Sequence, residues 1–266
     1  MARPPIPYFC AMIAAKHEEP LEVAGYCRDC DAVHSLPSTL AAAHCKQLLH
    51  ELFTHKRLDF DLPEAASDPE LSTGFLYADM GGKMFGILVC EDANGKEIVL
   101  KAFSGKYNDR RTIPGWAPHL FDEARFNAVI AEGNKGIHPL TDRISSLSKG
   151  SPEWKNAIEE RKLVSHGILE QLYALYEVRN FKREVRSLSE AFRFTKSIPT
   201  GTGDCCAPKL LNEAAIRGLK PLSLAEFFLG TPSGTKSEGT FYPPCEDKCG
   251  PLLGFILCGS ADIRFF

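Results

Sequence analysis

Two pairs of cysteines near the C-terminal end of the chain have the residue type and spacing of metal ligands. Cys205 and Cys206 are adjacent at the predicted start of a helix, and three residues separate Cys245 from Cys249. Thiolates bind zinc, and the amino end of a helix favours the charged form of a thiol. We therefore predict a zinc site at Cys205, Cys206, Cys245 and Cys249, with one or both of the adjacent pair as ligands. Buried cysteines or a redox pair are the alternatives.

A second group of candidate ligands lies in the first fifth of the chain. Cys27 and Cys30 are separated by two residues, a spacing common in zinc knuckles, and His34 and Cys45 follow at workable distances. These four residues form a candidate second metal site. A redox pair and plain structural cysteines remain open as alternatives, because the chain has no second pair with this spacing.

A basic stretch follows the middle of the chain, with Phe181 and Phe192 among its charged residues. Its candidate RNA contacts are Arg179, Lys182, Arg183 and Arg186. Cations of this kind bind phosphates, and an aromatic ring between them can stack on a base. The alternative is a solvated face of a helix.

Composition limits the classes of function. The 266 residues carry a net charge of −3, which argues against a general nucleic-acid binder but allows a local basic patch. No stretch approaches the roughly 20 apolar residues that span a bilayer, and prolines interrupt the N-terminus where a signal peptide would be apolar. We expect a cytoplasmic protein without a membrane partner. In a reducing compartment, ten cysteines point to metal binding or redox chemistry more than to disulfides.

The elements that must position these residues follow from local patterns. Two apolar runs, 84–90 and 98–103, flank Asn94-Gly95 and predict a β-hairpin in which both turn residues take positive φ. Residues 39–52 read as a helix, and the polar stretch 59–73 reads as a linker. Residues 121–181 predict two antiparallel helices joined at Lys149-Gly150, because apolar residues recur every three or four positions. That seam contains Phe126, Ile130, Gly133, Ile137, Leu140, Ile144 and Leu147.

The last part of the chain alternates between helix and strand signals. A helix is expected over 208–215, a strand over 222–229 and a short buried helix over 249–258. We expect three regions: an N-terminal cysteine-containing region (1–72), an α/β zinc-binding core (73–106 and 185–266) and an inserted helical hairpin (107–184).

This order of elements resembles the zinc core of the cytidine deaminase superfamily. In that family a hairpin precedes a helix beginning His/Cys-x-Glu, and a strand then leads to a Pro-Cys-x-x-Cys helix start. Here the corresponding residues are Cys206-Ala207-Pro208 and Pro244-Cys245 with Cys249. The resemblance implies an α/β (α+β) fold with a deaminase-like zinc core and an inserted antiparallel helical hairpin. Pro208 stands where the family has its proton-carrying glutamate.

Three segments resemble an N-terminal extension found in a subset of RluA-type RNA pseudouridine synthases. They are Gly201 to Leu211, Pro221 to Phe228, and Tyr242 to Cys245 with Cys249. The resemblance implies a zinc-binding protein associated with RNA modification, whose partner is RNA or an RNA-modifying enzyme. The catalytic domain of that family carries His-Arg-Leu-Asp, of which His55-Lys56-Arg57-Leu58-Asp59 is a partial lookalike with an inserted lysine.

Three hypotheses therefore stand: an accessory zinc module in RNA modification, a zinc-dependent nucleoside or base deaminase, and an interaction protein whose fold is stabilised by zinc. The number of ligands discriminates between them. Three protein ligands leave a coordination position for water and favour the deaminase, whereas four close the site and favour the other two.

Overall fold

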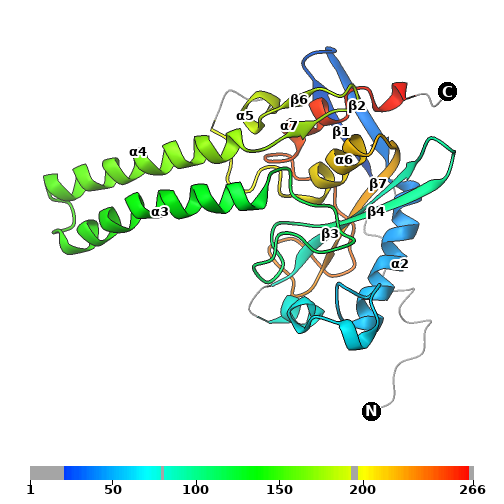
Figure 1. The fold of residues 1–266 in the computed structure, drawn as a ribbon, viewed down its shortest axis with the longest axis horizontal. Coiled ribbons are helices and arrows are strands. Elements are labelled where there is room, and N and C mark those ends of the chain that lie inside the picture. Colours follow the sequence, from blue (N-terminus) through cyan, green and yellow to red (C-terminus); the bar gives the residue numbers. More distant parts are fainter. Residues whose placement is uncertain (1–20, 79–80, 193–196, 264–266) are drawn as a thin grey trace. The chain divides into compact units, whose positions relative to one another are not determined.

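The computed structural model describes residues 21–78, 81–192 and 197–263 (Figure 1). The chain divides into two compact units. The first contains Met1–His119, Arg179–Glu184 and Phe192–Phe266, and the second contains Leu120–Val178 and Val185–Ala191. The described residues before position 73, expected to form a region of their own, belong to the first unit. Helices combine with antiparallel sheets, so the fold class is α+β.

A three-stranded antiparallel sheet is the centre of the first unit. Strands β3 (Lys83–Glu91), β4 (Glu97–Phe103) and β7 (Lys220–Leu229) lie in the order β4-β3-β7. β3 is buried from Met84 to Cys90 because strands pair with both of its edges and helices cover both of its faces. The predicted hairpin is confirmed, but its turn differs. Gly95 has a positive φ and Asn94 does not, since the carboxylate of Asp92 accepts hydrogen bonds from two backbone N–H groups of the loop.

Two helices cover opposite faces of this sheet. Phe85 and Ile87 point toward α2 (Thr39–His55), whose apolar stripe includes Leu48 and Leu52. Gly86 lies on the other face, against α6 (Cys206–Ile216). A Cβ at Gly86 would lie 2.7 Å from the Cβ of Cys206, so a larger residue would push the helix away. The glycine thus fixes the depth at which the start of α6 sits.

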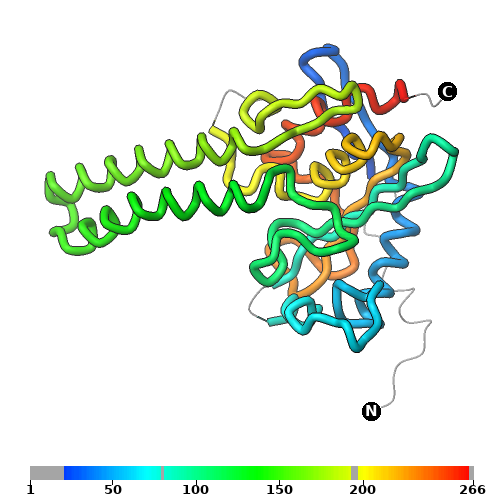
Figure 2. Tube along the Cα trace, in the orientation of Figure 1, coloured from blue at the N-terminus to red at the C-terminus, as the bar shows by residue number. Residues whose placement is uncertain are grey.

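A β-hairpin that the sequence patterns did not reveal packs against the C-terminal helix. Strands β1 (Glu22–Cys27) and β2 (Ala32–Pro37) pair in antiparallel register, and α7 (Gly250–Ile256) lies on β1. Figure 2 shows this N-terminal hairpin in blue beside the red C-terminal segment. The contact is backbone to backbone, since a Cβ at Gly254 would lie 1.9 Å from the carbonyl oxygen of Tyr26. Segments from opposite ends of the chain therefore meet here.

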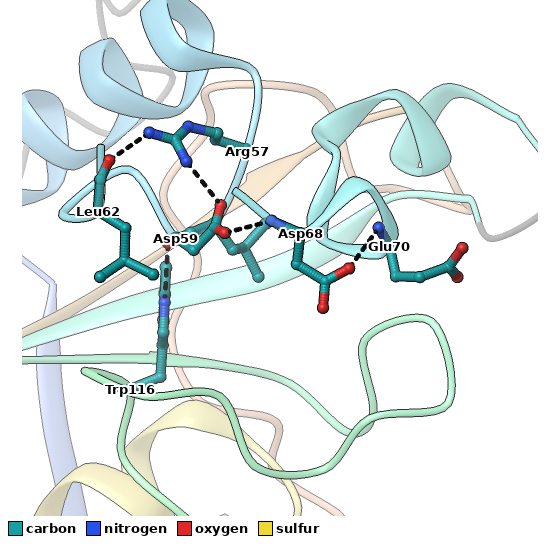
Figure 3. A network of polar contacts seen from close by, with 7 residues as sticks. Arg57, Asp59, Leu62, Asp68, Glu70 and Trp116 are labelled. Carbon is teal, nitrogen blue, oxygen red and sulfur yellow. Dashed lines mark hydrogen bonds and ion pairs between the residues drawn. The ribbon is translucent and has the colours of Figure 1, made fainter. Parts of the chain in front are cut away.

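The stretch expected to be a linker, 59–73, is instead packed into the first unit. It forms short 3-10 turns at Glu64–Ala66, Pro69–Leu71 and Thr73–Tyr77, and Leu71 and Thr73 are buried. Figure 3 shows the contacts that hold it. The carboxylate of Asp59 lies 3.4 Å from the guanidinium of Arg57 and accepts a 2.8 Å hydrogen bond from the Asp68 N–H. The partial lookalike of the synthase motif is thus an internal ion pair that supports a loop.

The second unit is a helical hairpin. Helices α3 (Glu123–Ser146) and α4 (Pro152–Ala174) run side by side (Figure 1), and every residue of the predicted seam is half-buried. Asp122 and Ser151 cap the two helices through side-chain hydrogen bonds. At Gly133 the helices approach so closely that a Cβ would lie 2.6 Å from Ile168. No described helix is both long and apolar enough to span a membrane.

The helical prediction extends too far at its C-terminal end. α4 ends at Ala174, and the chain continues as the short paired strands β5 (Val178–Arg179) and β6 (Val185–Arg186), followed by α5 (Leu188–Ala191). The basic stretch therefore lies on a β-ribbon, with Lys182 and Arg183 exposed in its turn. It is not the solvated helix face that was the alternative to RNA contact.

Candidate metal centres

Three thiols from separate segments converge at the starts of two helices. Cys205 is the N-cap residue of α6, Cys249 is the N-cap residue of α7, and Cys245 lies in the loop between β7 and α7. Their sulfur atoms all lie within 4.8 Å of one another. These residues are called the three-thiol site below.

The spacing between the Cys205 and Cys245 sulfurs fits a tetrahedral metal. The Cys205 and Cys245 sulfurs are 3.7 Å apart, while two thiolates bonded to one zinc at about 2.3 Å lie about 3.8 Å apart. Hydrogen bonds from the thiols of Cys205 and Cys249, and from the backbone N–H groups of Cys249 and Lys248, hold the pKa of Cys245 well below its ordinary value. The site therefore already stabilises a thiolate, which is the form that binds metal.

Cys206 is not part of this cluster. It lies in the core between α6 and the sheet, and its thiol donates to the carbonyl oxygen of Met84 at 3.3 Å. Burial raises the pKa of Cys206 well above its ordinary value. Successive helix residues point about 100° apart, so when Cys206 faces the sheet, Cys205 faces the loop that carries Cys245. Of the four predicted ligands, the structure brings together three.

Glu226 is a functional candidate that belongs to none of the sequence motifs. It lies in β7, opposite Gly86, and is fully buried. Its carboxylate accepts a 2.8 Å hydrogen bond from the Ala207 N–H, in the first turn of α6. Burial raises the pKa of Glu226 to about 7, and the negative charge of Cys245 adds to the effect. The sequence signal was available, because Glu226 is the single charged residue within the expected apolar strand 222–229.

A buried lysine and an imidazole–carboxylate pair adjoin the same helix start. Lys209 is fully buried and donates to the Phe103 carbonyl oxygen at 2.9 Å, and burial lowers its pKa to about 8. Asp204 lies 3.3 Å from the Nδ1 of His119, and the pKa of His119 is lowered, mainly by burial. Asp204 is therefore already engaged by a side chain other than the thiols.

Four donors form a second cluster at the β1–β2 hairpin. Cys27 ends β1, Cys30 lies in the turn, His34 lies on β2, and Cys258 comes from beyond the end of α7. The donor atoms lie within 4.8 Å of one another, and the sulfurs of Cys30 and Cys258 are 3.3 Å apart. A hydrogen bond from Cys258 lowers the pKa of Cys30. These residues are called the four-donor site below.

The fourth donor of this site is Cys258, whereas the sequence predicted Cys45. The thiol of Cys45 points into the core and lies 3.4 Å from the Ala225 carbonyl oxygen, and burial raises its pKa. Cys45 is thus part of the apolar stripe of α2, together with Ala41, Leu48 and Leu52. The other three predicted ligands of the second site do converge.

The basic residues predicted to contact RNA have different surroundings. Lys182 lies beside the four-donor site, with its Nζ 3.5 Å from the sulfur of Cys30, and its pKa is raised by the sulfurs of Cys258 and Cys30. The backbone N–H of Arg179 donates to Asn212, and Arg183 is exposed with a φ of 67°. Arg186 is half-buried on β6.

Comparisons of the chain with protein-family models, with curated proteins and with solved structures find no match.

Proposed function

We propose that this chain is a zinc-binding protein that serves RNA modification as an accessory module. The main support for zinc binding is that the sulfur atoms of Cys205, Cys245 and Cys249 lie within 4.8 Å of one another. Thiolates are soft ligands, and a set of sulfurs at tetrahedral spacing favours zinc over the hard cations magnesium and calcium. The donor set fits the metal, because three sulfurs converge in a cluster that already stabilises a thiolate.

The link to RNA modification rests on the segments that resemble the synthase extension. These segments supply the start of α6, strand β7 and the start of α7, which are the elements that build the three-thiol site. A resemblance concentrated on one site supports a shared use of that site. The engagement of Asp59 by Arg57 and Asp68 supports an accessory role, since that carboxylate is held in a structural network.

RNA binding is tested by fluorescence anisotropy with a labelled structured RNA at about 50 and about 200 mM salt. We expect affinity to fall steeply with salt and Arg183→Gly to reduce the salt slope by about one. Glycine suits this test because Arg183 has positive φ, so the variant removes the charge without straining the turn. The matched control is Lys162→Ala, an exposed lysine of the helical hairpin. Absence of binding at the lower salt would refute the RNA association.

A second candidate function, zinc-dependent deamination, is favoured by the position of Glu226. Among the described residues the thiol cluster offers three donors, and three protein ligands leave a zinc position for water. Zinc supplies Lewis-acid activation of water when bound. Burial raises the pKa of Glu226 toward neutral, and its carboxyl group lies at the first turn of the same helix, where Pro208 has no proton to give. Glu226 is therefore the side chain best suited to carry a proton to a departing amine.

A cytidine assay separates the two candidates. The accessory function predicts turnover well below about 1 per second, the lower end of ordinary enzyme rates. Turnover at or above that rate, together with a loss of about a hundred- to ten-thousand-fold in Glu226→Gln at unchanged zinc content, would establish the deaminase instead. Pro208→Glu serves as the comparison, because it places a carboxylate at the family's own position.

A further inference from the structure

In the first unit, the Nε2 ring nitrogen of His34 is buried without a hydrogen-bond partner among the residues that the structure describes. Buried polar atoms are nearly always satisfied, so such an atom calls for an explanation. The sulfurs of Cys27, Cys30 and Cys258 and one ring nitrogen of His34 lie within 4.8 Å of one another in a single cluster. A metal ion bound by these sulfurs and by Nε2 would satisfy that nitrogen.

The donor set specifies the class of ion and the type of site. Three thiolates and one imidazole are a common ligand set of structural zinc, and four protein ligands leave no position for substrate. Three thiolates around a divalent cation leave a net charge of −1 on the site. The ammonium group of Lys182, 3.5 Å from the Cys30 sulfur, is placed to offset it.

The four-donor site joins segments that are distant in the sequence. Cys30 and Cys258 are 228 residues apart, and the hairpin that carries Cys30 meets α7 through the backbone contact between Gly25 and Gly254. A Cβ on Gly25 would lie 2.2 Å from the backbone nitrogen of Gly254. A metal bound by these four donors would hold the end of α7 against β1.

The same short helix connects both clusters. Cys249 is the N-cap residue of α7, and Cys258 follows the end of the helix at Ile256. Fixing Cys258 therefore fixes the segment that presents Cys249 and, through the hydrogen bond from the Cys249 N–H to the Cys245 carbonyl oxygen, Cys245 as well.

We propose that Cys27, Cys30, His34 and Cys258 form a closed structural zinc site, and that zinc at this site raises the metal affinity of the three-thiol site through α7. The closed site concerns ligands outside the function proposed above, whereas the coupling rests on the zinc binding proposed there for the three-thiol site; neither depends on RNA binding. Coupling of this kind is reciprocal, so metal at the three-thiol site strengthens the four-donor site by the same factor.

Cobalt(II) titration tests the proposal, because cobalt–thiolate absorption reports both stoichiometry and affinity. The full chain should bind two cobalt ions. His34→Ala should lose one and bind the other at least about tenfold more weakly. Cys245→Ser should lose the other ion and weaken the four-donor site by a similar factor. His34→Cys, which keeps four donors, should restore both ions and the coupling, and thus shows that loss in His34→Ala is not general misfolding.

Two results would overturn the proposal. A wild-type chain that binds one cobalt ion, with a spectrum unchanged by His34→Ala, would show that the four-donor site holds no metal. Two ions with an unaltered three-thiol affinity in His34→Ala would show that α7 does not couple the sites. Failure of RNA binding would leave these titrations unchanged, so the two proposals fail separately.

Discussion

Replacing Gly254 by alanine tests how closely the C-terminal helix must approach the N-terminal hairpin. The added Cβ would lie 1.9 Å from the carbonyl oxygen of Tyr26, 2.2 Å from its carbonyl carbon and 2.7 Å from the nitrogen of Cys27. All three atoms belong to the backbone of β1, so no side chain can rotate aside. Strand and helix must separate, and the segment bearing Cys27 must move.

Two opposing effects set the magnitude. Alanine is better than glycine inside a helix by about 1 kcal/mol, which stabilises the variant. Overpacking in a tight core costs about 1–3 kcal/mol and occasionally more, and a backbone clash belongs at or above the upper end. We expect a net loss of about 2–3 kcal/mol. For a chain of this length that corresponds to a melting temperature lower by roughly 4–12 °C.

The assay is thermal unfolding followed by near-ultraviolet circular dichroism, with zinc content measured on the same samples. Gly250→Ala is the matched control, because it lies in the same helix and its Cβ would meet nothing closer than the Cys245 carbonyl oxygen at 3.6 Å. That variant should melt at or slightly above the wild-type temperature. If Gly254→Ala has the melting temperature of the wild type and retains its zinc, the close contact between β1 and α7 is not present in solution.

Three further predictions test other parts of the molecule. In elemental analysis, Cys205→Ser should lose the zinc of the three-thiol site. Cys206→Ser should retain it, because the Cys206 thiol faces Met84. Equal loss in both variants would contradict the assignment of ligands. Burial lowers the pKa of Lys209 from 10.5 to about 8, so its charged form opposes folding and stability should rise with pH between these values. Relative to Lys209→Met, the wild type should gain about 3 kcal/mol across that window in urea unfolding, and parallel pH profiles would disprove the shift. Ile168→Asp should reduce far-ultraviolet helicity and lower the melting temperature, because Ile168 fills the space over Gly133; an unchanged melt would exclude the helix pairing.

Elements with local signals could be predicted from the sequence. The hairpin of β3 and β4, strand β7 and the two long helices follow from apolar periodicity within a few residues. The β1–β2 hairpin could not be predicted in this way, because it is short and its buried residues, such as Val23 and Cys27, form no long pattern. The stretch 59–73 has the composition of a linker but is packed, because its polar residues bond to one another and to Arg57 inside the fold.

Two of the predicted ligands that do not join a cluster could have been recognised as core residues from the sequence. Cys45 falls on the apolar stripe of α2, four residues after Ala41 and three before Leu48, which marks it as a core residue. Cys206 likewise precedes Leu210 by four residues and shares its buried face. Cys258 is different. Its partner Cys30 is 228 residues away, and only the packing of α7 on β1 brings the two together.

The burial of Glu226 links the architecture of the three-thiol site to its charge. An N-cap residue ordinarily bonds the first helical N–H groups through its own side chain, but Cys205 makes no such bond because its sulfur turns toward Cys245. Glu226 supplies the bond from the adjacent strand, at 2.8 Å from the Ala207 nitrogen. The Cys205 thiol is therefore available to the cluster, and the carboxyl group of Glu226 is buried near it. Three ionised thiols and this carboxylate would repel one another strongly, so the site requires either bound protons or a divalent cation. The convergence of the three sulfurs within 4.8 Å, with the Cys205 and Cys245 sulfurs at tetrahedral spacing, favours the cation.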